Sequence, residues 1–172
     1  MEPSIFMSDF VRTEWSDGHF GMLGRALVIA TRFEASVRSL AVLVDLKAAP
    51  EALESEELID RLIEAAWERR LFKDLKHLGL DKDEVGDTLK AARLARNEVA
   101  HEITLGLDRC LDLLPTAAVI DLGRDVRALV QALAKGDRTV CALLTVVTND
   151  HRPSREFLQS YPDRIEQWVC DT

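Results

Sequence analysis

Arg96, Asn97 and His101 are the residues whose types and spacing best support chemistry in this sequence. They lie in the segment AARLARNEVAHE, which covers residues 91–102. Arginine presents a planar fork of N–H donors that suits two-point contacts with phosphate or carboxylate groups. Histidine gains and loses a proton near neutral pH. Together these side chains could bind an anion beside a group that moves a proton.

Arg96 also occupies an unexpected position in the predicted helix. It falls on the apolar stripe, where a leucine would be expected, and the other members of the stripe are Val85, Leu89, Ala92, Val99 and Ile103. Two explanations remain open. Arg96 faces a partner protomer, or it pairs inside the monomer with Glu34, which is the charge on the apolar stripe of the first helix. Similarly, His101 could serve only as a cation near the C-terminus of its helix.

The elements that position these residues are predicted to be helices throughout. Hydrophobic periodicity indicates an all-α bundle of about four long helices plus a short C-terminal helix. The long helices are expected at residues 17–47, 56–78, 81–104 and 116–149, and the short one ends near Trp168. Whether residues 117–149 form one helix or two is open, because Lys135–Asp137 could interrupt them. The run Val140–Val147 could be a strand, but a single strand would lack a partner, so we favour helix.

The predicted helix ends rest on capping residues. Asp17 is the expected cap of the first helix, and Gly79 is expected to close the second. Asp81 and Glu84 have the spacing of a capping box for the third. The first helix carries a heptad-like stripe, which consists of Phe20, Leu23, Leu27, Ala30, Val37, Ala41 and Val44.

Composition limits the functional classes. The chain has 172 residues, 47% of them hydrophobic, a net charge of −8 and a pI of about 5.0. This length suits one domain, and the charge disfavours a protein that coats nucleic acid with a broad basic surface. A local basic pocket remains compatible. Only six of the 22 basic residues are lysine, so most cations are arginines, although compositional bias would explain that excess without any function.

Neither a metal, a cofactor nor a membrane is expected from the sequence. Cys110, Cys141 and Cys170 are odd in number and widely spaced, so they predict free thiols rather than a disulfide framework or a zinc site. The first residues lack the pattern of a signal peptide, and the longest apolar run is too short to cross a bilayer. We therefore expect a cytoplasmic protein.

The segment from Arg93 to His101 resembles the HEPN superfamily, named for a nucleotide-binding domain of higher eukaryotes and prokaryotes. The signature of that family is Arg, then usually Asn, Asp or His, then three residues and His, as in Arg96–His101 here. The first helix is also similar, because an Arg and a Glu interrupt its apolar pattern. The resemblance covers roughly residues 17–149. Residues 1–16 would be an N-terminal extension, and residues 150–172 a loop and short helix on the same domain.

The resemblance implies a metal-independent endoribonuclease that works as a homodimer on RNA, as in toxin and defence proteins with a cognate antitoxin. Arg96 would hold the scissile phosphate, His101 would be general base or acid for attack by the ribose 2′-OH, and Asn97 would orient either group. Glu34 and Arg93 would support them. On a regular α-helix Arg96 and His101 point about 140° apart, so a partner protomer is expected to complete the site.

Other hypotheses stay open. Many HEPN relatives are non-catalytic nucleotide- or RNA-binding or regulatory proteins, and an unrelated helical adaptor would leave Arg96 and His101 structural. Glu98 and Glu102 flank the motif and would repel RNA. Ile103 stands where relatives silenced by adenylylation carry Tyr, so that control is not expected. The segment Trp67–Arg70 could contact RNA, but we favour a helix with the Trp packed and the Arg residues solvated.

Overall fold

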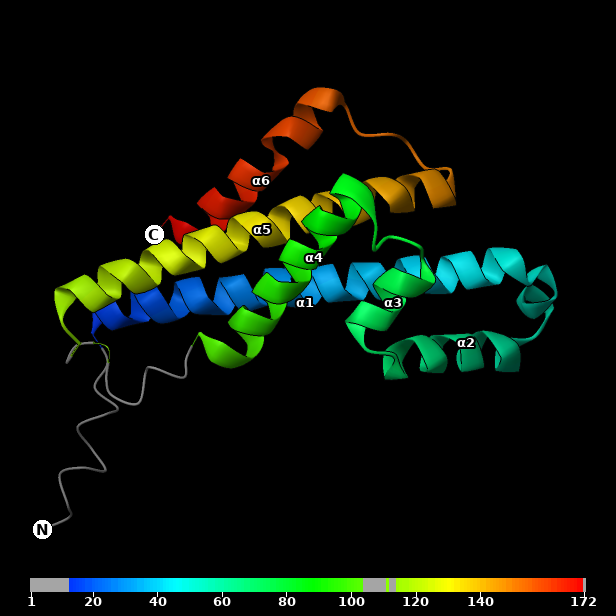
Figure 1. The fold of residues 1–172 in the computed structure, drawn as a ribbon, viewed down its shortest axis with the longest axis horizontal. Helices are drawn as coiled ribbons and strands as arrows, with labels where there is room; N and C mark the ends of the chain where they lie inside the picture. The colour runs from blue at the N-terminus through cyan, green and yellow to red at the C-terminus, as the bar shows by residue number, and fades with distance from the viewer. Residues whose placement is uncertain (1–12, 104–110, 112–113, 172) are drawn as a thin grey trace, which may run out of the picture.

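The computed structural model describes residues 13–103, 111 and 114–171, and throughout these residues the protein is all-α (Figure 1). No strand occurs among them, so the predicted fold class is confirmed at that level. No helix in this part of the chain is both long and apolar enough to cross a membrane. The elements in chain order are α1 (Glu14–Ala48), the 3₁₀ turn η3 (Pro50–Glu54), α2 (Glu56–Glu68), α3 (Leu71–His77), α4 (Asp83–Asn97), the π-helical turn η4 (Glu98–Glu102), α5 (Thr116–Thr148) and α6 (Arg155–Cys170).

The long helices α1 and α5 form the centre of the molecule (Figure 1). They run in the same direction, and α4 crosses them and packs mainly on α5. Helix α6 returns along α5, while α2 and α3 lie beside the C-terminal half of α1. This arrangement places the end of α4 against the middle of α1, which is where Arg96 and Glu34 lie.

The core stripe of α1 differs from the predicted heptad stripe. Phe20 and Leu27 are about half exposed, at 51% and 46%, whereas Phe33 is fully buried. An α-helix drifts by about 20° for every seven residues, so a strict heptad pattern leaves the core face over 35 residues. The buried stripe follows the 3.6-residue period instead, and it consists of Met22, Leu23, Ala26, Ile29, Ala30, Phe33, Val37, Leu40 and Ala41.

Helices α1, α4 and α5 pack closely against one another at Gly136. A Cβ atom built on Gly136 would lie 2.3 Å from the Cβ atom of Ala92 and 3.1 Å from Cε2 of Phe33. Real side chains do not approach to 2.3 Å, so only glycine fits at this crossing. The glycine of the Lys135–Asp137 segment therefore allows α4 to pack, and α5 continues through it as one helix.

Gly136→Ala is therefore expected to destabilise the fold by about 1–3 kcal/mol, because the added methyl group overpacks the crossing. Gly123→Ala is the matched control on α5, since nothing lies within 4 Å of its Cβ position. That substitution should leave stability unchanged or raise it by up to about 1 kcal/mol through better helix propensity. Urea denaturation of both variants measures the difference, and equal midpoints would show that the close approach is absent.

Several predicted helix ends were wrong. Thr13, not Asp17, caps α1, because its Oγ1 accepts the N–H of Ser16 at 3.1 Å while Ser16 Oγ accepts the N–H of Thr13. Asp81 and Glu84 form no capping box, since α4 begins at Asp83 after Lys82 and no side chain caps it. The Asp81 backbone instead lies over the first turn of α4, close to Gly86.

The predicted second helix is two helices. Arg69 and Arg70 are extended, with ψ of 141° and 140°, and they separate α2 from α3. The break turns Leu71 and Leu75 into the core beside α1, where both are buried. Gly79 follows α3 in the left-handed conformation, with φ of +67°, as predicted for a closing glycine.

The C-terminal half follows the prediction more closely. Residues 116–148 form one helix, so Val140–Val147 is helical and not a strand. Helix α6 extends to Cys170, slightly beyond Trp168. The predicted end of the third helix at Thr104, and Cys110, lie outside the described residues.

A buried carboxylate joins α5 to α1 and α6. Asp137 is 1% exposed, and it accepts hydrogen bonds from Arg32 Nε at 3.0 Å and from the Tyr161 hydroxyl at 2.5 Å. Burial and the hydrogen bond to Asp137 raise the pKa of Tyr161 well above its ordinary value. The tyrosine therefore stays a hydrogen-bond donor at neutral pH, and the cluster holds the C-terminal helix on the bundle.

Candidate functional site

The π-helical turn η4 brings Arg96 and His101 together within one protomer. Ile103 donates its N–H to the carbonyl of Glu98, five residues earlier, at 2.9 Å. In such a turn, residues five apart lie about one turn apart, whereas four is the spacing in an α-helix. Arg96 Nη1 accordingly lies 3.3 Å from Nε2 of His101. The expectation that these two side chains diverge within one chain was wrong, because it assumed a regular α-helix.

The guanidinium of Arg96 is held on two sides. Its Nε and Nη2 groups donate to Oε2 of Glu34, with a distance of 2.6 Å from Nε. Nη1 donates to Oδ1 of Asn97 at 3.3 Å and points toward His101. For His101 Nε2 to accept this contact, the imidazole must be unprotonated at that nitrogen. The structure therefore gathers Arg96, Asn97, His101 and Glu34 into one cluster.

Glu34 links the cluster to a second arginine on its own helix. Its Oε1 accepts a hydrogen bond from Nη2 of Arg38 at 2.5 Å. The side chains are mostly buried, with exposed fractions of 13% for Glu34, 17% for Arg38 and 24% for Arg96. Arg96 on the apolar stripe is thus paired inside the monomer with Glu34, which is one of the two explanations that the sequence left open.

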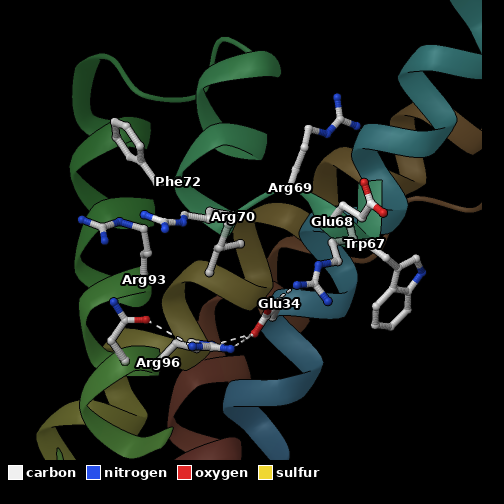
Figure 2. Close-up of a pocket in the computed structure, with 11 residues that line it drawn as sticks. Glu34, Trp67, Glu68, Arg69, Arg70, Phe72, Arg93 and Arg96 are labelled. Atoms are coloured by element: carbon white, nitrogen blue, oxygen red, sulfur yellow. Dashed lines mark hydrogen bonds and ion pairs between the residues drawn. The ribbon is translucent and has the colours of Figure 1, made fainter. Parts of the chain in front are cut away.

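A pocket of about 690 Å³ opens beside this cluster, and we call it the arginine pocket (Figure 2). Helices α1 and α4 and the break between α2 and α3 contribute its walls. Five of its lining residues are arginines and only two are carboxylates, in a chain whose net charge is −8. The lining residues are Glu34, Arg38, Trp67, Glu68, Arg69, Arg70, Leu71, Phe72, Arg93, Arg96 and Asn97.

Two exposed aromatic rings stand at the arginine pocket, and each has an arginine over it. The Arg38 guanidinium lies 4.7 Å from the ring centre of Trp67, and the Arg93 guanidinium lies 5.5 Å from that of Phe72. Trp67 is 60% exposed, so the favoured hypothesis of a packed tryptophan was wrong. Phe72 was not singled out in the sequence, and only the break before α3 places it here.

The glutamates that flank the motif point away from the arginine pocket. Glu98 and Glu102 line a separate groove between α4 and α5, together with Asp125. Partial burial and the neighbouring Glu102 carboxylate raise the pKa of Glu98 above its ordinary value. These two carboxylates would therefore repel RNA from the groove between α4 and α5 and not from the arginine pocket, where arginines outnumber carboxylates.

The described residues offer little to a metal ion. Nowhere in residues 13–103, 111 and 114–171 do three or more His, Cys, Asp or Glu side chains gather in a way that could hold one. Cys141 and Cys170 are free thiols, and burial raises the pKa of each.

Comparison of the chain with models of known families, with curated proteins and with solved structures finds no match. The site's own geometry is therefore the basis for any functional assignment.

Proposed function

We propose that the protein is a metal-independent endoribonuclease of the HEPN type, with Arg96, Asn97 and His101 at its active site. The observation that carries the proposal is the contact between Arg96 Nη1 and His101 Nε2 at 3.3 Å within one protomer. It places a permanent cation beside a histidine ring nitrogen, next to a pocket lined with arginines. When a ribose 2′-OH attacks the adjacent phosphate, the reaction requires groups of these two kinds.

In the proposed reaction His101 is the general base. The phosphate of the substrate takes the Nη1 edge of Arg96, which frees His101 Nε2 to accept the proton of the 2′-OH. The O2′–P bond forms, the bond from phosphorus to the 5′ oxygen breaks, and charge that develops on the phosphate is stabilised by Arg96. Glu34 holds the guanidinium from the opposite side, so the arginine is positioned before substrate arrives.

A second copy of the motif would supply the general acid. The leaving 5′ oxygen needs a proton, and the base has just taken one, so a second imidazole suits the role. We propose a homodimer in which two motifs share one cleft, as the resemblance to the HEPN superfamily implies. Arg96 and His101 meet within one protomer, so the dimer would add an acid rather than assemble the arginine–histidine pair.

A non-catalytic RNA-binding or regulatory protein is the second candidate. The observation that favours it is that Glu34 already occupies the Nε and Nη2 groups of Arg96, which leaves only its Nη1 edge for a ligand. Such a protein would bind RNA through the arginine pocket and leave it uncut. A cytoplasmic location and a cognate antitoxin remain part of the ribonuclease proposal.

The test is cleavage of single-stranded RNA by the purified protein in EDTA. We expect products with a 2′,3′-cyclic phosphate and a 5′-OH, and no cleavage of DNA, which lacks the nucleophile. Mass spectrometry of the fragments identifies both ends. Activity that disappears in EDTA would contradict the metal-independent mechanism, and RNA that binds without being cut would favour the second candidate.

A further inference from the structure

The arginine pocket has the features of a binding site for unpaired nucleotides. We propose that it holds single-stranded RNA beside the bond that is cut, with bases stacked on Trp67 and Phe72 and phosphates bound by Arg70 and Arg93. This inference rests on the proposed ribonuclease, because it names the form of RNA that the same site takes. It is tested by binding, so it can fail independently of cleavage.

Among the described residues, the ion pairs of the pocket leave two arginines without a carboxylate partner, and the guanidinium of one of them, Arg93, lies over the Phe72 ring with its N–H groups unpaired. Arg38 and Arg96 donate to Glu34. Arg69 makes ion pairs with Asp45 at 3.2 Å and with Asp74 at 2.9 Å, which tie the break to α1 and α3.

Arg70 and Arg93 make no ion pair with any described residue, and both line the pocket. Figure 2 shows these two side chains on the same side of the pocket, above Arg96. Arg96 is proposed to bind the scissile phosphate. An unpaired arginine in the pocket beside it is suited to bind the next phosphate along the strand.

The two rings supply surfaces for bases. Trp67 and Phe72 are 60% and 53% exposed although Arg38 and Arg93 lie over their rings, so part of each ring surface remains open for a base to stack on. They lie on opposite sides of the pocket in Figure 2, because the break at Arg69–Arg70 separates α2 from α3. Bases stack on aromatic rings and on arginine planes regardless of their identity, so this pocket would accept RNA with little sequence preference.

The shape of the pocket favours unpaired nucleotides. Its volume of about 690 Å³ lies within the range of about 300–1,000 Å³ that is usual for sites that hold small ligands. In a duplex the bases are stacked on each other and their faces are covered, so they cannot reach the two rings. Single-stranded RNA can turn its bases into the pocket while its phosphates follow Arg70 and Arg93.

The experiment measures binding of a short fluorescein-labelled 2′-O-methyl RNA by fluorescence anisotropy. The methyl group blocks the nucleophile, so the strand stays intact. We expect Trp67→Ala and Phe72→Ala to raise Kd about tenfold each through lost stacking, and Trp67→Phe to stay within about twofold of the wild type. Arg70→Gln and Arg93→Gln should each raise Kd about fivefold and lower the salt slope by roughly one phosphate contact.

Matched controls come from α6, where Arg164 lies 5.4 Å from the ring centre of Phe157. Phe157→Ala and Arg164→Gln remove a similar pair outside the pocket and should leave Kd unchanged. Annealing the strand to its complement should weaken binding at least tenfold. Equal Kd values for pocket and control variants, or equal binding of the duplex, would overturn the proposal.

Two further outcomes separate this inference from its premise. If AMP binds in the pocket and the strand does not, the site is one for free nucleotides and the inference is overturned. If the strand binds through the pocket and RNA is not cut, the inference stands and the proposed ribonuclease fails. Cleavage that is unaffected by Trp67→Ala together with Phe72→Ala would reject the inference alone.

Discussion

Replacing His101 with Ala is expected to lower RNA cleavage by about 10²–10⁴-fold, because the general base is lost. RNA affinity should stay close to that of the wild type, since His101 does not line the arginine pocket. Arg96→Ala should cost at least about 10²-fold through lost stabilisation of the charged phosphate. Single-turnover cleavage with saturating protein separates these effects from binding.

Arg96→Lys is the sharper variant, because it keeps a cation next to Glu34 and so protects the fold. It should still cut poorly, since an ammonium cannot bind Glu34 and a phosphate at once through a planar fork. Thermal melts establish that each variant is folded. Full cleavage by folded His101→Ala would remove this residue from the mechanism, and full cleavage by Arg96→Lys would show that only the charge matters.

Mixing the two inactive variants tests where the catalytic pair is assembled. Arg96 and His101 meet within one chain, so a dimer of one Arg96→Ala protomer and one His101→Ala protomer has no intact pair. We expect no recovery of activity after the variants are mixed and re-equilibrated. Recovery would show that Arg96 of one protomer works with His101 of the other.

The parts of the fold that depend on local pattern could be predicted from the sequence. Hydrophobic periodicity identified most of the helices, but it left open whether α5 continues through Lys135–Asp137, which the structure shows that it does. The pairing of Glu34 with Arg96 could also be anticipated, because two opposite charges on apolar stripes each need a partner. The pattern could not show whether that partner lies in the same chain. In the structure it does, since Arg96 Nε lies 2.6 Å from Oε2 of Glu34.

The features that depend on tertiary context could not be predicted. No glycine or proline marks the break at Arg69 and Arg70. Asp45, which accepts a hydrogen bond from Arg69, lies 24 residues away in sequence. Without the break, Trp67 and Phe72 would share one helix, and the arginine pocket would not form. The π-helical turn could not be predicted from the sequence either. Over so short a segment, the spacing of apolar residues does not distinguish a π-helical turn from a regular α-helical turn.

Replacing Glu34 with Gln is expected to lower the free energy of unfolding by about 2–3 kcal/mol. The amide leaves Arg96 and Arg38 mostly buried without a carboxylate, and breaking a buried pair costs about 3–5 kcal/mol. We expect a cost below that range because Arg96 and Arg38 are 24% and 17% exposed, so water partly solvates the unpaired charges. Urea denaturation at neutral pH measures the change.

Glu57→Gln is the control, because Glu57 pairs with Arg61 on α2 while the two side chains are 76% and 67% exposed. It should cost less than about 0.5 kcal/mol, as is usual for exposed pairs one helical turn apart. The double variant Glu34→Gln with Arg96→Met should recover part of the loss, since it removes the unpaired cation. A melting temperature unchanged by Glu34→Gln alone would show that water, rather than Glu34, compensates the charge of Arg96, and that the arginine is not held in advance for a phosphate.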